Sequence, residues 1–205
     1  MTHKGITNIS TDDVAVAQEL GYVIKLVGDV REVESGISAE VSPTFLPKNR
    51  PLASVNDVMN AVFVESIGIG ESMYYGPGAG QKPTATSVLA DIIRIARRLS
   101  DGNVGKPFNE FRRDLPLANP ADVKSNYYFA LDTPDEKGKI LHLSEIFNSE
   151  DISFEQVLQQ KANGTTARIV VITHAMSKTQ LKAVTEKLEA AEDFTVVNTL
   201  KVLSN

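Results

Sequence analysis

A glycine-rich loop that leads directly into a helix constrains this chain more than any other stretch. The loop, Gly76-Pro-Gly-Ala-Gly80, follows a strand-like run at 72–75 and precedes apolar residues that recur at helical spacing from Pro83 to Leu99. Proline is tolerated at position 83 because N–H groups in the first turn of a helix have no partner within the helix. The pattern therefore predicts a strand, a tight turn and a helix over 83–99.

The glycines Gly76, Gly78 and Gly80 have two interpretations. Small residues let a backbone approach a ligand closely, and they direct free N–H groups and the positive end of a helix dipole toward it. A strand-to-helix turn needs glycine for its dihedral angles alone, and the spacing by itself favours this simpler interpretation. The dinucleotide fingerprint G-x-G-x-x-G is not met, because Gln81 stands at the third glycine position. The loop is therefore not the phosphate-binding turn of a Rossmann domain.

Composition narrows the class of protein. Hydrophobic residues make up 42% and charged residues 23% of 205 residues, which is typical of a globular chain with one or two domains. A net charge of −5 argues against nucleic acid or an anionic membrane as partner. The chain has no cysteine, no signal peptide and no apolar run of membrane-spanning length, so we expect a cytoplasmic protein. Its three histidines, His3, His142 and His174, have no second ligand at metal spacing, so no metal site is expected.

The first half of the chain predicts a small α+β layer. A capped helix begins at Ser10 and closes at Gly21, and two alternating strands follow, at 22–31 and 37–45. A hairpin is predicted from strands at 60–66 and 69–75, turned at Gly68 or Gly70. The helix at 83–99 is then expected to cover this antiparallel or mixed sheet. We take residues 1–100 as one domain and residues 101–125, rich in proline and glycine, as a linker.

The second half, residues 126–205, predicts the order strand, helix, strand, strand, helix, strand. A strand at 127–132 is followed by a helix, and strands at 152–161 and 167–173 form a hairpin around Asn163-Gly164. Ser177 and Gln180 form a capping box that starts the second helix, and a last strand covers 194–203. This βαββαβ order is that of the ferredoxin-like split fold.

Several of these residues carry a resemblance to a known family. Pro51-Leu-Ala53, Asn60-Ala-Val62, the glycine loop and the run from Pro83 to Asp91 resemble, in that order, the closing half of the catalytic domain of homoserine dehydrogenase. That family interconverts L-aspartate 4-semialdehyde and L-homoserine with NAD(P), in threonine and methionine biosynthesis. The resemblance implies that Gly76, Gly78 and Gly80 approach the nicotinamide end of the cofactor.

The resemblance also indicates what this chain lacks. The nucleotide-binding domain and the acid/base lysine of the family precede the part that is matched, so we interpret the chain as a C-terminal fragment with no catalytic residue of its own. We expect the chain alone to be inactive and to bind no cofactor. The preference between NAD and NADP cannot be predicted, because the residue that meets the ribose lies in the missing domain.

The second half resembles an ACT domain, a small module that binds amino acids, usually between paired copies, and regulates enzymes allosterically. The matching residues are Asp135-Glu-Lys-Gly138, Ile152-Ser153 and Ile172-Thr-His174. The resemblance implies an amino-acid effector, with L-threonine as the candidate, bound by Asp135, Gly138, Thr173 and His174, and it implies a homodimer. Lys139 departs from the small apolar residue usual after the turn glycine, so it either rims this pocket and alters its selectivity or leaves the pocket non-functional.

Two other functions remain open at this point. The chain is alternatively a non-catalytic module that senses an amino acid and forms dimers. A plain structural α+β protein, in which the glycine loop is only a turn, is the third interpretation, and the order of motifs along the chain disfavours it.

Overall fold

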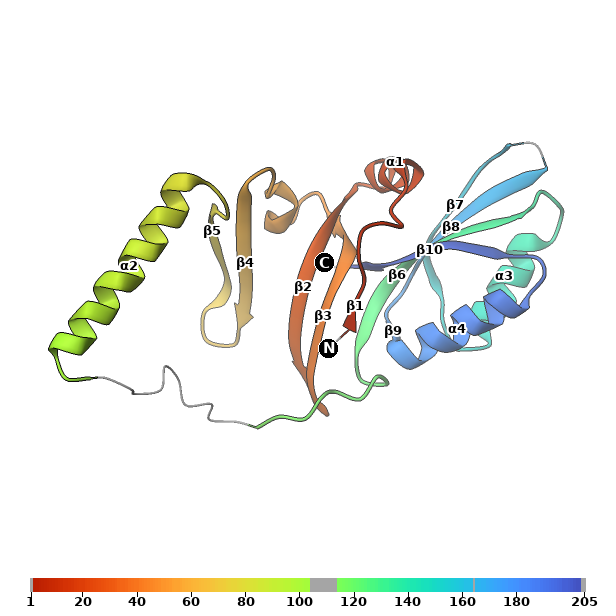
Figure 1. Cartoon of the computed structure of the whole chain (residues 1–205). Helices are drawn as coiled ribbons and strands as arrows, with labels where there is room; N and C mark the ends of the chain where they lie inside the picture. The colour runs from red at the N-terminus through yellow and green to blue at the C-terminus, as the bar shows by residue number, and fades with distance from the viewer. Residues whose placement is uncertain (1, 104–113, 164, 204–205) are drawn as a thin grey trace. The chain divides into compact units, whose positions relative to one another are not determined.

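The computed structural model describes residues 2–103, 114–163 and 165–203. In these residues the chain has a mixed α/β fold with four α-helices, one large mixed sheet and a separate two-stranded sheet (Figure 1). It forms two compact units, residues 1–48 with 115–205 and residues 49–114. The expected domains at 1–100 and 126–205 and the linker at 101–125 follow other boundaries, and their assignment stays a prediction. The two compact units differ from these expected domains because residues 1–48 hydrogen-bond to the second half of the chain.

The N-terminal elements form as their local sequence predicts. Helix α1 (Thr11–Glu19) begins at the Ser10 N-cap, whose side chain accepts a hydrogen bond from the Asp13 N–H, and Asp13 bonds back to Ser10. Gly21, at a φ of +84°, follows the helix end. Strands β2 (Tyr22–Val33) and β3 (Gly36–Pro47) form a long antiparallel hairpin, and the short strand β1 (Thr2–His3) pairs in parallel with β3.

The second half has the predicted order of elements. Strand β6 (Lys124–Pro134) leads to helix α3 (Lys139–Asn148), and strands β7 (Phe154–Asn163) and β8 (Thr166–Thr173) form a hairpin. Gly164, at its predicted turn, lies outside the described residues. The short strand β9 (Met176–Ser177), helix α4 (Lys178–Ala190) and strand β10 (Thr195–Val202) complete the chain. The strands lie in the antiparallel order β10-β6-β8-β7, and β10 also pairs in parallel with β3.

The large sheet carries a hydrophobic core on each face. On one face Phe129 and Leu131 of β6 pack with Leu143 and Phe147 of α3 and with residues of α4. On the other face Val16 and Ala17 of α1 join a cluster from four strands, namely Phe45, Tyr128, Ala130, Val170, Ile172, Leu200 and Val202. Figure 1 shows α3 and α4 side by side along the strands that they cover. The first 48 residues therefore complete a core whose remaining members lie more than 80 positions later in the chain.

Polar contacts also join the two halves of this unit. Lys201 of β10 is 5% exposed, and its ammonium lies 2.5 Å from an Asp29 oxygen on β2. Burial lowers the pKa of Lys201 although Asp29 favours the charged form. Lys178, the first residue of α4, lies 2.7 Å from Glu40 of β3. These ion pairs fix β2 and β3 against elements from the end of the chain.

The carboxylate of Asp13 is the most enclosed acid of this core. It is 1% exposed, and it accepts hydrogen bonds from the Tyr128 hydroxyl at 2.9 Å and the Asn198 amide at 3.0 Å. Burial by itself raises the pKa of Asp13, but the bonds from the Ser10 backbone, Asn198, the Ser10 hydroxyl and Tyr128 outweigh it and hold this pKa below its usual value.

This shift makes the stability of the chain depend on pH. Because the folded-state pKa of Asp13 lies below its unfolded value of about 4, its stabilising effect is full above about pH 5 and is lost as the pH falls through the folded-state pKa. We expect Asp13→Asn to lower the urea midpoint of unfolding at pH 7, and this deficit should shrink as the pH falls toward 2. The exposed Glu189→Gln is the control. A deficit that is equal at pH 7 and pH 3 would contradict the assignment.

The smaller unit contains the predicted hairpin and the long helix. Strands β4 (Met59–Ser66) and β5 (Gly70–Pro77) pair as predicted, with Gly70 at a φ of +76° in the turn, and a short 3-10 helix (Pro51–Ser54) precedes them. Helix α2 (Gln81–Ser100) begins two residues before Pro83. Proline is tolerated there because the first four N–H groups of a helix have no intrahelical partner.

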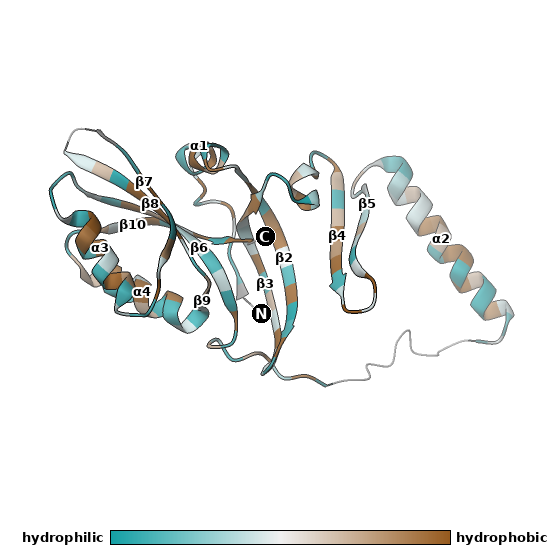
Figure 2. Cartoon of the chain, turned by 180° about the vertical axis from the view of Figure 1, so that it is seen from behind, coloured by the Kyte–Doolittle hydropathy of each residue, from teal (hydrophilic) through white to brown (hydrophobic). Residues whose placement is uncertain are grey.

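The expectation that this helix covers the β4–β5 sheet is wrong within the smaller unit. No described side chain of α2 is buried, and its aliphatic residues, such as Leu89 and Ile92, are 57% exposed. Figure 2 shows hydrophobic and hydrophilic bands along the helix. An isolated two-stranded sheet offers too small an apolar face to bury such a helix. In the described residues no helix is long and apolar enough to cross a membrane.

Candidate functional site

The glycine loop joins β5 to α2, and each of its glycines has a different environment. A Cβ built on Gly78 would lie 1.9 Å from the Asn60 amide nitrogen, and Gly80 adopts a φ of +128° that strains other residues. The turn itself therefore accounts for Gly78 and Gly80. Gly76 is different, because its φ is not positive and a Cβ built there would meet no atom within 4 Å. The space beside Gly76 is open to a group that approaches its backbone.

The start of α2 offers hydrogen-bond donors beside this loop. Gly80 is the N-cap and has no side chain with which to cap the helix, and Pro83 has no N–H. The N–H groups of Gln81 and Lys82 therefore have no partner within the helix, and the positive end of the helix dipole lies there. This arrangement fits a polar or anionic group of a ligand.

The turn between β6 and α3 carries two of the predicted effector residues. Gly138 caps α3 in the left-handed conformation at a φ of +89°, and the Asp135 N–H donates to the Thr165 carbonyl at 3.0 Å. The first N–H groups of α3 are thus free for an anion. The ammonium of Lys139 lies 2.6 Å from Asp193, on the loop before β10, and 3.3 Å from Glu136, so its charge is paired beside this turn.

The other two predicted effector residues lie at the opposite end of the sheet. Strands β6 and β8 are antiparallel, so the end of β6 pairs with the start of β8, while Thr173 is the last residue of β8 and His174 follows it. At about 3.3 Å per residue, six or more residues of strand separate them from Asp135 by about 20 Å. The expectation that Asp135, Gly138, Thr173 and His174 share one pocket is therefore wrong within a single chain.

Thr173 also has a structural partner. Its side chain is fully buried, and its hydroxyl oxygen accepts a hydrogen bond from the Tyr127 N–H at 3.1 Å. His174 is exposed, and its backbone N–H donates a hydrogen bond to the Ser153 carbonyl at 3.0 Å. Thr173 thus satisfies a backbone donor of β6, which explains its burial without a ligand.

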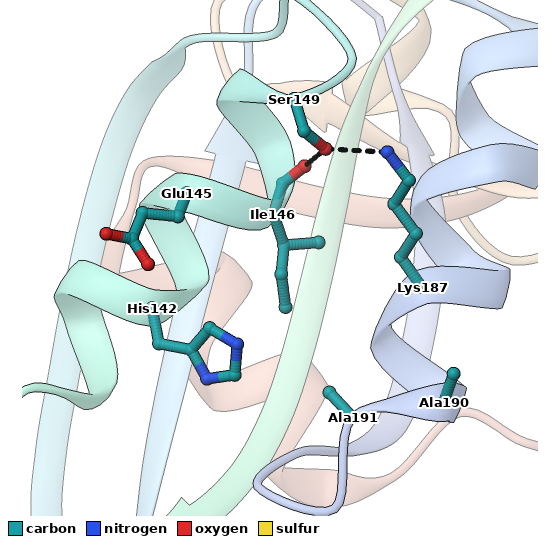
Figure 3. A pocket seen from close by; sticks show the side chains of 7 residues that line it. All are labelled: His142, Glu145, Ile146, Ser149, Lys187, Ala190 and Ala191. Atoms are coloured by element: carbon teal, nitrogen blue, oxygen red, sulfur yellow. Dashed lines mark hydrogen bonds between the residues drawn. The ribbon is translucent and has the colours of Figure 1, made fainter.

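Two hollows flank the Lys139–Asp193 contact. A cavity of about 620 Å³ lies at the end of β6, where Thr133 and Asp135 meet Glu192, Asp193 and Thr195. A groove of about 490 Å³ runs between α3 and α4 (Figure 3); its polar rim is formed by His142, Glu145, Ser149 and Lys187. His142 Nδ1 lies 2.8 Å from Asp193, and the hydrogen bonds from Lys139 and His142 lower the pKa of Asp193. Lys187 donates to the Ser149 hydroxyl at 2.7 Å.

Sequence reasoning missed Thr133, Glu192 and Asp193. Thr133 precedes Glu192 and Asp193 by about 60 positions in the chain, and only the pairing of β6 with β10 brings the three residues together. Among the described residues no three histidine or acidic side chains form a group able to hold a metal ion.

Comparison with known proteins gives a consistent result along the whole chain. A family model described as homoserine dehydrogenase matches residues 1–93. A homoserine dehydrogenase of Lactococcus lactis is 58% identical over 205 residues, which is 100% of this chain and 48% of that protein. One of Bacillus subtilis is 34% identical and is matched by 92% of this chain over 44% of its own length.

A solved structure agrees with these sequence matches. The crystal structure of a homoserine dehydrogenase from Thiobacillus denitrificans matches with a TM-score of 0.88 at 31% identity, over 99% of this chain and 48% of that one. The chain thus spans about half the length of the relatives it matches. Along its whole length the chain is similar to homoserine dehydrogenases.

Proposed function

We propose that this chain forms the C-terminal half of an NAD(P)-dependent homoserine dehydrogenase, which interconverts L-aspartate 4-semialdehyde and L-homoserine. The observation that carries the proposal is the full-length match to such enzymes at 58% identity, over about half of their length. In the intact enzyme the nicotinamide cofactor supplies hydride transfer. The role of this chain is then to place the backbone of Gly76, Gly78 and Gly80, and the first N–H groups of α2, beside a polar group of that cofactor.

The same proposal predicts the behaviour of the chain alone. Hydride transfer needs the cofactor held against the substrate and a proton donor within reach. The glycine loop supplies one part of this arrangement, and its sequence lacks the dinucleotide fingerprint. We expect the purified chain to give no homoserine-dependent NADH or NADPH. The absorbance of the reduced cofactor measures this, with NAD and NADP tested in turn. Formation of NADH or NADPH above a buffer blank would contradict the proposal.

The second half fits a ferredoxin-like ACT module that binds an amino-acid effector. Its support is the element order β6-α3-β7-β8-α4-β10 with strands in the order β10-β6-β8-β7. The effector site is the β6–α3 turn: the N–H groups after Gly138 receive the effector carboxylate, and Asp135 receives its ammonium. L-threonine is the candidate that the family resemblance implies, and threonine control of the enzyme in a cytoplasmic biosynthetic pathway is part of this proposal.

A homodimer is the proposed assembly. Large apolar side chains are exposed on β2, where Val30 is 71% exposed, and on the hairpin β4–β5, where Val62 and Tyr74 are 61% and 69% exposed. Soluble proteins rarely leave such groups without a partner, and a second copy pairs them across a two-fold axis. We expect sedimentation equilibrium at micromolar concentration to give twice the mass of one chain. A single species of monomer mass would refute the dimer.

A further inference from the structure

Helix α2 carries a continuous apolar face that the described residues leave uncovered. The residues that fall on this side of the helix, at a period of 3.6, are Ala85, Val88, Leu89, Ile92, Ala96 and Leu99. The large members of this set are each more than half exposed. The opposite side of the helix holds Asp91, Arg94 and Arg98. The helix is therefore amphipathic, and its apolar face is the side made to be buried.

The extent of this face indicates a binding surface. From Ala85 to Leu99 it runs for about 20 Å along the helix, at about 1.5 Å per residue. Soluble proteins rarely expose a contiguous apolar patch of this kind unless another surface covers it. Its spacing, with anchors three and four residues apart, is that of a helix which lies in an apolar groove of a partner. The face therefore fits a groove rather than a small ligand.

Two observations indicate which partner supplies the groove. The Lactococcus lactis relative matches 100% of this chain over only 48% of its own length, so about half of that enzyme is polypeptide that this chain does not contain. In addition, the N-cap of α2 is Gly80, the last glycine of the loop that we propose to lie beside the cofactor. A domain that brings the cofactor to Gly76 also reaches the first turn of α2, and the apolar face continues along the same helix.

We propose that the apolar face of α2 docks in an apolar groove on the other half of the enzyme, the half that holds the nicotinamide cofactor. The inference rests on the function proposed above and names the surface by which the two halves associate. Leu89 and Ile92 are the central anchors, and Ala85 and Ala96 allow a close approach of the backbone. The charged side of α2 stays in water. The docked helix then holds the glycine loop in place beside the cofactor.

Cysteine labelling tests this docking surface, because the chain has no cysteine of its own. Ile92→Cys places a thiol on the apolar face, and Ala90→Cys places the control thiol on the opposite side of the same helix. Each variant is treated with a maleimide as the chain alone and as a chimera, in which this chain replaces the matching half of the Lactococcus lactis relative. Mass spectrometry of the peptide that carries the introduced cysteine gives the rate.

The expected result is a ratio of rates at each position, which removes differences in thiol pKa between the two positions. We expect position 92 to react at least about 100-fold more slowly in the chimera than in the chain alone, because reaction then requires local opening of the interface. Position 90 should react at the same rate in both. In the chain alone, both variants should melt at the temperature of the unchanged chain, because neither side chain is buried there.

The other possible covers give different results. Slow labelling at position 92 in the chain alone that is relieved by dilution would assign the face to a second copy. Slow labelling at every dilution would assign it to the chain itself, and either result would overturn the proposal. A chimera that turns over homoserine but is labelled freely at position 92 would overturn the docking surface alone. A chimera that is protected at position 92 without turnover would support the docking surface and contradict the proposed function.

Discussion

Replacing Phe45 with alanine is expected to lower the free energy of unfolding by about 3–5 kcal/mol, the range for removal of a fully buried aromatic ring. Phe45 is 0% exposed, and its ring lies 4.4 Å from the Tyr128 ring and 5.8 Å from the Tyr22 ring, measured between centroids. It thus joins β2 and β3 to β6 from the second half. Because small domains are stable by only about 5–15 kcal/mol, this loss is a large part of the total.

Urea unfolding of the full chain, followed by circular dichroism, measures this loss. Ile67→Ala is the matched control, because Ile67 is fully exposed in the turn between β4 and β5 and should change the free energy by less than about 0.5 kcal/mol. A Phe45→Ala loss of no more than about 1 kcal/mol, typical of an ordinary substitution, would show that residues 1–48 and the second half do not share a core.

Gly76→Val is expected to lower kcat/KM for homoserine about 100-fold in a chimera, the effect of a displacement of about 1 Å at a reacting centre. In this chimera the chain replaces the matching half of the Lactococcus lactis relative. A Cβ at Gly76 meets no atom of this chain within 4 Å, and the φ of Gly76 is not positive. The substitution therefore leaves the stability of the chain unchanged, and its effect on catalysis arises from a group outside the chain.

Gly68→Val provides the comparison, because a Cβ at Gly68 also meets no atom within 4 Å and its φ is not positive. Gly68 lies in the hairpin turn, away from the loop that begins α2, so its variant should keep the kcat/KM of the chimera. An unchanged kcat/KM for Gly76→Val would leave the simpler interpretation, a strand-to-helix turn, as the whole role of the glycine loop.

The elements of this fold were predictable where their cause is local. The capping boxes at Ser10 and Ser177 and the pairing of β2 with β3 depend on neighbouring residues, and each is present. The expected alternation of buried and exposed residues in these two strands is wrong, because Val30 is 71% exposed and Thr44 is 2% exposed. The parallel pairing of β10 with β3 has no such local cause, because it joins residues more than 150 positions apart. The division of the chain into units was therefore not predictable from composition and turns.

The candidate site was predictable only in part, for the same reason. The turn at Asp135–Gly138 and the glycine loop are continuous in sequence and were both identified there. Whether Thr173 lies near the Asp135–Gly138 turn depends on the direction of the strands. Because β6 and β8 pair in an antiparallel manner, Thr173 lies at the opposite end of the sheet from that turn. Glu192 is brought to the cavity by tertiary structure alone. The apolar residues of α2 are also exposed, although their helical spacing predicts a buried face. Such spacing does not indicate which surface the face packs against.

Steady-state turnover of homoserine by the chimera, with NAD and NADP in turn, tests most directly whether this chain is half of a working homoserine dehydrogenase. We predict homoserine-dependent production of NADH or NADPH with a kcat within about tenfold of the intact relative, a difference of about 1.4 kcal/mol in activation free energy. Neither half alone should give turnover. A folded, dimeric chimera that gives no turnover with either cofactor would contradict this assignment.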